Sequence, residues 1–460
     1  MLRSDNRAGA EFGPLSVAFC LTALLLLLVM TGGLLEWLGI PQSASRFAVE
    51  CLALLLIACG VRRCDRASLV SVACASIPLV LAWSIGGANA LASGASALQI
   101  ALFSREIGTP VLFMAAFLLA PLGTSERHHL LKLLLSLTLL QVAVCVVKLF
   151  WIGANEKGWI GTMHQSAGQL GLLTPLLALG FIWAVALVHR TPWKVFLVAT
   201  SVGLVAVASE KRALLVMMPL VPIGVLVCHA IFHRFFCKSY KRVSVSLLAN
   251  YAASAFMSCV LLIALALSSI DSLRSSDYSK LGVNGVFEYI YVYMTRDFDS
   301  EMNRSDFSVD ENLNIQMGRL RIIVVAVDIV SDSDLYTMLL GGGGGRLLAH
   351  PRLNNGSDVM YREVGLRGPS GLAIRHLFEI GFLGVFLVLG WMGWMVVLLV
   401  NSAGSGANQV LVLGALGCVG VLAFDYLIYS ESGWYSGVLL PLVTFLVAQA
   451  ITSKSSSLVA

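Results

Sequence analysis

The chain has 460 residues, of which 58% are hydrophobic and 12% are charged, and its mean hydropathy is +0.84. Because soluble domains carry roughly 25% charged residues, this composition excludes a soluble protein and indicates a polytopic membrane protein. The net charge of +5 does not indicate a nucleic-acid partner, since Lys and Arg in such a protein are sorted by side of the membrane.

Apolar segments long enough to cross a bilayer as helices, about 17 to 25 residues each, recur along the chain. We expect about twelve spans, with ten or eleven as alternatives because the second and seventh are short. The spans are placed at 15–32, 47–61, 68–87, 108–123, 130–150, 167–188, 193–208, 213–232, 247–269, 377–400, 408–429 and 436–452. The Ala-, Ser- and Gly-rich piece at 88–102 is expected to be interfacial or re-entrant.

The N-terminal end is expected to keep its first helix, because the first apolar segment lacks an Ala-x-Ala-like cleavage site. With the N-terminus inside, fourteen Lys and Arg residues fall on the inner side. The short outer loops hold six, namely Arg46, Arg105, Lys148, Lys157, Lys211 and Arg212. This positive-inside bias places both termini in the cytoplasm and the long polar stretch at 271–376 outside. The expected organisation is a membrane bundle at 1–270, an outer loop at 271–376 and a second membrane part at 377–460.

Inside this loop, residues 319–330 are expected to form one helix that is too short to span a membrane. Arg319, Ile323, Ala326 and Val330 follow helical spacing, so this stripe is expected to rest on the membrane body, with Arg321 on the wet face. Five consecutive glycines follow at 341–345. They suit either a plain flexible loop or a phosphate-cradling turn. The Lys-Ser/Thr of a P-loop is missing, which excludes nucleotide binding of that type.

Two cations, Lys211 and Arg212, lie in a short outer loop at the level of lipid headgroups. They are either snorkelling side chains at a helix end or ligands for the phosphates of a lipid-linked substrate. Arg105 is a similar candidate, with a mutual salt bridge to Glu106 as the alternative. His164, before the sixth span, is either a general base or a solvated loop histidine.

The loop and its exit supply the other candidate ligands for an anion. Arg319, Arg321 and His350 lie within the loop, and surface side chains in a solvated loop are the alternative interpretation. At the exit, Glu379 either complements the dipole of the helix that starts there or holds Arg375, four residues earlier, at the i to i+4 spacing.

Together, these motifs resemble the O-antigen ligase and polymerase family, the integral membrane enzymes of the WaaL and Wzy type. The family's Gly-Thr and Asn/Gln-x-x-Gly stretch is similar to residues 161–171, and its Ser-x-x-Arg motif to Ser209-Glu210-Lys211-Arg212. Its Gly-Arg, Leu-Leu-Gly-rich and Glu-x-Gly-x-x-Gly signatures are similar to residues 318–319, 339–345 and 379–384. The resemblance covers roughly residues 150–390 and implies a GT-C-like, all-α fold with one large periplasmic loop.

One departure separates the two branches of the family. The ligase branch carries a His-Asn pair about nine residues before the glutamate, where this chain has Ser370-Gly371. The polymerase branch often has an arginine four residues before it, as Arg375 precedes Glu379. The resemblance therefore favours a polymerase, with transfer of glycan to lipid A-core as the alternative.

The resemblance implies metal-independent glycosyl transfer without a cofactor, on the outer face of the bacterial inner membrane. The donor is a glycan on undecaprenyl diphosphate, and a chain-length regulator and flippase of the same pathway are the implied partners beside membrane lipid. Such chemistry stabilises a departing diphosphate and deprotonates a hydroxyl. Lys211, Arg212, Arg319 and Arg375 are expected to hold the diphosphate, with Glu379 positioning Arg375 and His376 or His350 as the base.

Two readings of other classes remain. A transporter, such as a lipid-linked oligosaccharide flippase, predicts internal repeats, charges near mid-membrane and discontinuous helices. The sequence shows no repeat between its halves and few charges within the expected spans. A structural or regulatory subunit of an export complex leaves the outer arginines unexplained.

Overall fold

The structure is a computed structural model, and every regular element in its described residues is helical. The described residues are 16–61, 66–152, 162, 170–208, 212–235, 244–269, 291, 295, 319–345, 347, 371–403, 409–429 and 439–452.

Each of the twelve predicted spans is occupied by a helix, which confirms the all-α expectation for the described part of the chain. The helices are α1 (Val17–Trp37), α2 (Gln42–Val61), α3 (Arg66–Ala92), α4 (Ala97–Leu119), α5 (Thr124–Ile152), α6 (Leu170–Val188), α7 (Pro192–Ala208), α8 (Arg212–Phe235), α9 (Val245–Ser269), α15 (Leu372–Ala403), α16 (Gln409–Phe424) and α18 (Leu439–Thr452). A π-helical turn, η4 (Asp425–Tyr429), continues α16.

Seven of these helices are long and apolar enough to cross a membrane by length and composition: α1 to α5, α15, and α16 with η4. Shorter apolar helices lie at Leu179–Val188, Leu220–Ile231, Val245–Leu261 and Leu439–Thr452. The chain is therefore a multi-pass helical membrane protein. Several of its helices expose large apolar side chains on the outside of the bundle, where lipid takes the place of a protein core.

Residues 88–102 do not form the separate re-entrant piece that was one of the two expectations for them. No separate re-entrant piece forms there, because α3 continues to Ala92 and α4 starts at Ala97, eleven residues before the predicted span. A capping box starts α4: the Ser96 side chain accepts from the Gln99 N–H, and the Gln99 side chain accepts from the Ser96 N–H. The Ser-x-x-Gln spacing was visible in the sequence, but the small-residue composition around it was given more weight.

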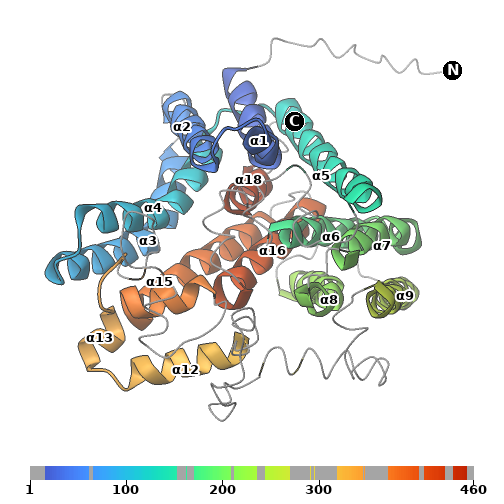
Figure 1. The fold of residues 1–460 in the computed structure, drawn as a ribbon. Coiled ribbons are helices and arrows are strands. Elements are labelled where there is room, and N and C mark those ends of the chain that lie inside the picture. The colour runs from blue at the N-terminus through green and yellow to red at the C-terminus, as the bar shows by residue number, and fades with distance from the viewer. Residues whose placement is uncertain are drawn as a thin grey trace.

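The helices form two groups with α15, α16 and α18 between them (Figure 1). On one side α15 packs along α3, and α18 packs on α4. On the other side α16 packs along α6, while α7 packs on α9. As a result, α15 lies between α3 of the N-terminal group and α16.

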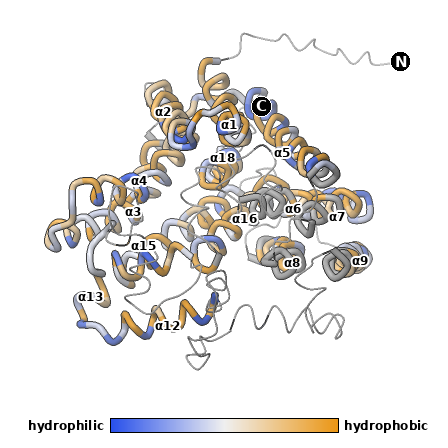
Figure 2. Tube along the Cα trace, viewed as in Figure 1, coloured by the Kyte–Doolittle hydropathy of each residue, from blue (hydrophilic) through white to orange (hydrophobic). Residues whose placement is uncertain are grey.

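Two short helices, α12 (Arg319–Ser331) and α13 (Leu335–Leu340), run along the edge of the bundle beside α15 (Figure 1). The predicted helix at 319–330 is confirmed. Its buried stripe is Arg319, Ile322, Ala326 and Val330, so Ile322 takes the place that was predicted for Ile323. This stripe packs against the first turns of α15. Asp328 and Asp332 are exposed, and α12 is more mixed in hydropathy than the bundle helices (Figure 2).

Asp334 caps the N-terminus of α13 by accepting hydrogen bonds from the N–H groups of Tyr336 and Thr337 and from the Thr337 hydroxyl. The bond from the Thr337 side chain, followed by those from the backbone, holds the pKa of Asp334 below its usual value. The cap fixes where α13 begins and, through it, where the glycines that follow at 341–345 enter the bundle.

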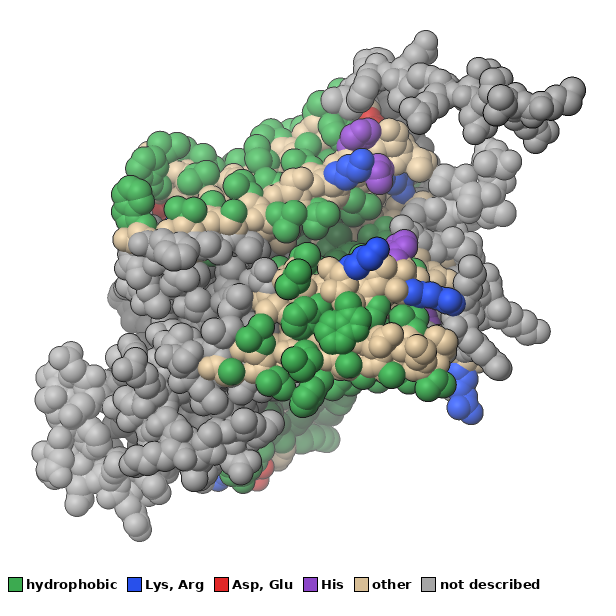
Figure 3. Space-filling model, turned by 90° about the vertical axis from the view of Figure 1, so that its right-hand side faces the viewer, with side chains coloured by type: hydrophobic (Ala, Val, Ile, Leu, Met, Phe, Trp, Pro, Cys, Tyr) green, Lys and Arg blue, Asp and Glu red, His purple; other side chains and the backbone are tan. Residues whose placement is uncertain are grey.

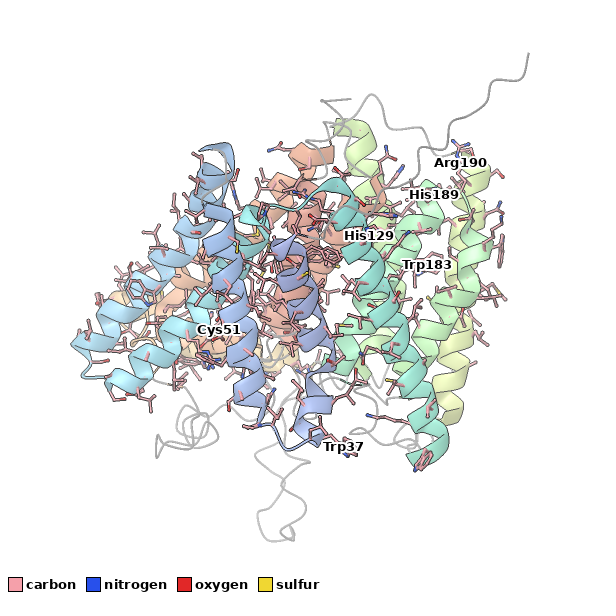
Figure 4. The ribbon with its side chains drawn as sticks, turned by 90° about the horizontal axis from the view of Figure 1, so that it is seen from above. Trp37, Cys51, His129, Trp183, His189 and Arg190 are labelled. Atoms are coloured by element: carbon pink, nitrogen blue, oxygen red, sulfur yellow. The ribbon has the colours of Figure 1, made fainter. Side chains whose placement is uncertain are left out.

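Cations and histidines gather at one end of one face of the bundle (Figure 3). On the side of α5, α7 and α9, an apolar face is bordered at one end by Lys, Arg and His side chains (Figure 3). His129, His189 and Arg190 lie toward this end, and Trp37 lies at the opposite end (Figure 4). An apolar band with cations gathered at one end is common in helix bundles that span a membrane.

Candidate site at the start of helix α15

The first turns of α15 carry three charged or titratable side chains that are almost completely buried. Arg375 is 2% exposed, and His376 and Glu379 are 0% exposed. Arg375 Nε lies 3.6 Å from Glu379 Oε2, an ion pair one helical turn apart. The predicted i to i+4 pairing of Arg375 with Glu379 is therefore confirmed.

Glu106 on α4 completes this group. It is 4% exposed and pairs with Arg375, while its Oε1 lies 3.1 Å from His376 Nε2. The alternative of a salt bridge between Arg105 and Glu106 was wrong, because neighbouring residues on a helix point about 100° apart. Arg105 instead donates from Nε and Nη2 to Glu50 Oε1 on α2, at 2.9 and 2.8 Å.

The π-helical turn η4 supplies a further pair of buried polar groups. Tyr426, 1% exposed, places its hydroxyl 3.0 Å from His376 Nδ1. Asp425, also 1% exposed, lies within electrostatic range of Arg319 on α12. Arg319 also donates to the Ile428 carbonyl at 3.3 Å. Single π-helical turns often occur at functional sites, because they re-aim side chains and free carbonyls.

The glycines at 341–345 are packed rather than open. The N–H groups of Gly342 and Gly343 donate to the carbonyls of Phe378 and Glu379, and the Gly344 N–H donates to the Gly86 carbonyl. A Cβ on Gly341 would lie 2.4 Å from the Glu379 carbonyl carbon. The sequence predicted either a flexible loop or a phosphate-cradling turn for these glycines, and the structure shows neither. Its close approach is to the backbone of α15 and α3.

The partner of this approach is a break in α15. Gly381 has φ +65° and ψ −173°, which is not helical, and a Cβ there would lie 2.4 Å from the Leu339 carbonyl carbon and oxygen. The break frees the Phe378 and Glu379 carbonyls to accept from the glycine run. Only glycines permit the two backbones to touch in this way on both sides of the contact.

The Glu379 carboxylate is held from the loop side as well. Its Oε1 accepts from the Leu347 N–H at 2.9 Å, and it also receives a backbone hydrogen bond from Gly345. Asn89 of α3 fixes the glycine run from below, by donating to the Leu340 carbonyl at 2.7 Å and accepting from the Tyr336 hydroxyl at 2.6 Å. The backbone at Gly345 and Leu347 therefore holds the carboxylate directly, and Asn89 of α3 holds the start of the glycine run beside it.

The remaining predicted site residues lie outside this cluster or outside the described residues. Arg105 faces α2, and Arg321 is half-buried on α12, on a different face from Arg319. Lys211, His164 and His350 lie outside the described residues, and Arg212 begins α8 with no described side chain. Of the Gly-Thr motif, Thr162 is described. Its hydroxyl donates to the Met30 carbonyl, and its backbone bonds Gln141 and Gly33, which ties it to α1 and α5.

Chemically, the cluster offers two guanidinium groups, three carboxylates, one imidazole and one phenol. Both ring nitrogens of His376 lie within hydrogen-bond distance of protein oxygens, with Glu106 on Nε2 and Tyr426 on Nδ1. Glu106 on one side and Tyr426 on the other therefore fix the orientation of the His376 ring. Glu106, Asp425 and Tyr426 were not among the predicted site residues. Asp425 lies inside the predicted span 408–429, so a charge within an apolar span pointed to it, whereas Glu106 lay just before the predicted span 108–123.

In comparisons with known proteins, no protein-family model and no curated protein matches this chain.

Proposed function

We propose that this chain is a polysaccharide polymerase of the bacterial inner membrane. It joins repeat units linked to undecaprenyl diphosphate on the periplasmic face of the membrane. One observation carries the proposal. The three motifs of its second half, at Arg319, at the glycines and at Arg375 to Glu379, converge on the first turns of α15 and the adjoining η4. Motifs that are separate in sequence and meet at one buried charged group are typical of a reaction site.

Glycosyl transfer from a lipid diphosphate needs positive charge where the leaving group develops negative charge. Arg375 and Arg319 supply it, with Lys211 and Arg212 at the start of α8 as further ligands. In the structure Arg375 is paired with Glu106 and Glu379. When a diphosphate binds there, Arg375 exchanges its carboxylate partners for phosphate oxygens. A guanidinium group binds carboxylate and phosphate oxygens in the same bidentate geometry.

The acceptor hydroxyl also needs a base. We assign this role to His376, acting through Tyr426, with His350 as the alternative. A ligase that transfers the glycan to lipid A-core uses the same donor and the same leaving group, so it remains the alternative within this class.

A second candidate is a carrier of lipid-linked oligosaccharide or of a small solute, and a specific observation favours it. The sequence suggested few charges within the spans and gave no sign of a broken helix. The structure has Glu106, Arg375 and Glu379 buried in membrane-length helices and a break at Gly381. Buried ionisable groups beside a discontinuous helix are common in transporters.

One assay separates these functions. The purified full chain is placed in liposomes with an undecaprenyl-diphosphate oligosaccharide, and the lipid-linked products are analysed by length and by leaflet. Lengthened lipid-linked glycan supports the polymerase, transfer to added lipid A-core supports the ligase, and translocation without a new linkage supports the carrier.

In cells, Arg319→Ala and Arg212→Ala are expected to abolish the polymer, because each removes a cation that binds the diphosphate. Polymer length is read from gels of extracted polysaccharide, with the membrane level of each variant measured beside it. Lys194→Ala, which removes an exposed cation on α7, is the matched control and is expected to leave the polymer unchanged. Polymer of ordinary length in both arginine variants contradicts the assignment.

A further inference from the structure

Three charged side chains lie between α2 and α4, on the face of α4 that points away from the site at α15. Arg105 binds Glu50 Oε1 through Nε and Nη2, and the two side chains are 42% and 20% exposed. Arg46, one helical turn before Glu50 on α2, lies within electrostatic range of both. Cys51, labelled in Figure 4, marks the neighbouring position on α2.

The charges in this group do not balance. Two guanidinium groups share one carboxylate, and within the described residues Arg46 takes part in no ion pair within 4.0 Å. Arg46 is half-buried, so its charge is not fully hydrated, and it shares the single Glu50 carboxylate with Arg105. The two guanidinium groups have more N–H donors than one carboxylate can accept from, and their positive charges repel each other. An anion bound between them would accept the remaining hydrogen bonds and reduce the repulsion.

The position of the group along the helices identifies the anion. α2 and α4 run in the same direction, since Glu50 meets Arg105 and, further along both helices, Gly60 approaches Leu119. At about 1.5 Å per residue, Arg46 lies roughly 6 Å inside the first residue of α2, and this helix of about 30 Å just matches a bilayer core. A long side chain at that depth reaches the lipid phosphates at the surface. Trp37, just before α2, lies at the same end of the bundle (Figure 4).

We propose that Arg46 and Arg105 form a binding site for the phosphate group of a membrane lipid. The site lies between α2 and α4, and Glu50 holds Arg105 in place for it. It is separate from the Arg375 cluster, because Arg105 and Glu106 point to different neighbouring helices. The headgroup can belong to a bulk anionic phospholipid or to an isoprenoid lipid phosphate, since both present the same phosphate oxygens to guanidinium donors.

Native mass spectrometry of the purified full chain tests this site without any assay of activity. The probes are undecaprenyl phosphate, undecaprenol, phosphatidylglycerol and diacylglycerol, so that each phosphate lipid is matched by the same tails without phosphate. We expect the wild type to bind the phosphate lipids more tightly than their matched alcohols. Arg46→Gln is expected to weaken that binding about tenfold, because a charge-assisted hydrogen bond is lost.

Arg46→Gln is the primary variant because it leaves the Arg105–Glu50 bridge intact, and Arg46→Lys is expected to keep most of the affinity. Glu50→Gln removes the carboxylate that holds Arg105 in place and is expected to weaken binding of the phosphate lipids, while Lys194→Gln on α7 is expected to change nothing. A loss for both phosphate lipids means a general headgroup site, and a loss for undecaprenyl phosphate alone means a carrier-lipid site. Equal binding of a phosphate lipid and its alcohol, or unchanged binding by Arg46→Gln, overturns the proposal.

Discussion

Two consecutive residues of α4 form ion pairs of opposite character. Arg105 meets Glu50 at an exposed position, whereas Glu106 meets Arg375 where both side chains are at most 2% exposed. Exposed pairs contribute about 0 to 1 kcal/mol because water and salt screen them. In a buried pair, loss of one partner leaves an uncompensated charge, which costs about 3 to 5 kcal/mol. The burial, rather than the chemistry of the pair, decides which one the fold depends on.

Glu106→Gln is therefore expected to lower the unfolding temperature in detergent clearly, because it removes a buried carboxylate that pairs with both Arg375 and His376. Glu50→Gln, which breaks the exposed pair by the same chemical change, is the matched control and is expected to shift it little. Thermal unfolding monitored by intrinsic fluorescence gives both values. Equal shifts in the two variants would mean that the buried pair has no special weight.

At the residue scale, the sequence predicted contacts between residues that are close together on one helix. Arg375 and Glu379 are four residues apart on one helix, so their contact was predictable. Glu106 lies 269 residues from Arg375, and no local pattern connects them. His376 was a candidate base, but the two oxygens that flank its ring come from α4 and η4. Those partners depend on how three helices pack.

At the scale of elements, the contact between the glycine run and the break in α15 is the central feature. Gly341 packs against the backbone of Glu379, and Gly381 packs against the backbone of Leu339. A Cβ on either glycine would lie 2.4 Å from a backbone atom of the other segment. Both have positive φ, at +76° and +65°. Because the loop amides of Gly342 and Gly343 bond the carbonyls that the break frees, the broken helix is stabilised from outside its own chain segment.

Gly381→Ala is expected to destabilise the protein by about 2 kcal/mol or more, since it combines a left-handed backbone with a backbone clash. Gly390→Ala lies on the same helix, where a Cβ would meet no atom within 4 Å. This control is expected to be neutral or stabilising by about 0.5 to 1 kcal/mol, because Ala favours a helix over Gly. Unfolding temperatures of the two variants decide the matter. A Gly381→Ala variant as stable as the wild type contradicts the break as a fixed feature.

The other elements show where local signals suffice. The helix at 319–330 was predicted from its apolar stripe, and α12 has that stripe buried against α15. The start of α4 was misplaced, although Ser96 and Gln99 spell a capping box. The glycine run could be assigned to a turn, but neither of its proposed roles was found, because the sequence of a loop does not state which surface it packs on.

At the scale of the whole molecule, the distribution of cations predicts how the bundle is oriented in the membrane. His129, His189 and Arg190 lie toward one end and Trp37 at the other (Figure 4). From the positive-inside bias we expect the first end in the cytoplasm and the α1–α2 turn on the opposite side of the membrane.

Fusions of alkaline phosphatase test this orientation, because the enzyme is active only where its disulfides form, outside the cytoplasm. A fusion after Ile40, between α1 and α2, is expected to be active. A fusion after Arg190, between α6 and α7, is expected to be inactive at a similar protein level. The reverse pattern contradicts the orientation and, with it, the periplasmic reaction of the proposed function.

The sequence by itself determined the class of the protein, the position of nearly every helix and the pairing of Arg375 with Glu379. These follow from hydrophobic length and helical spacing, which are local properties of the chain. The tertiary structure alone decided that Glu106, Asp425 and Tyr426 join Arg375 and Arg319, that the glycine run packs on a broken α15, and that Arg105 turns to α2. In each case the partner comes from a distant segment, so the contact exists only once the helices have packed.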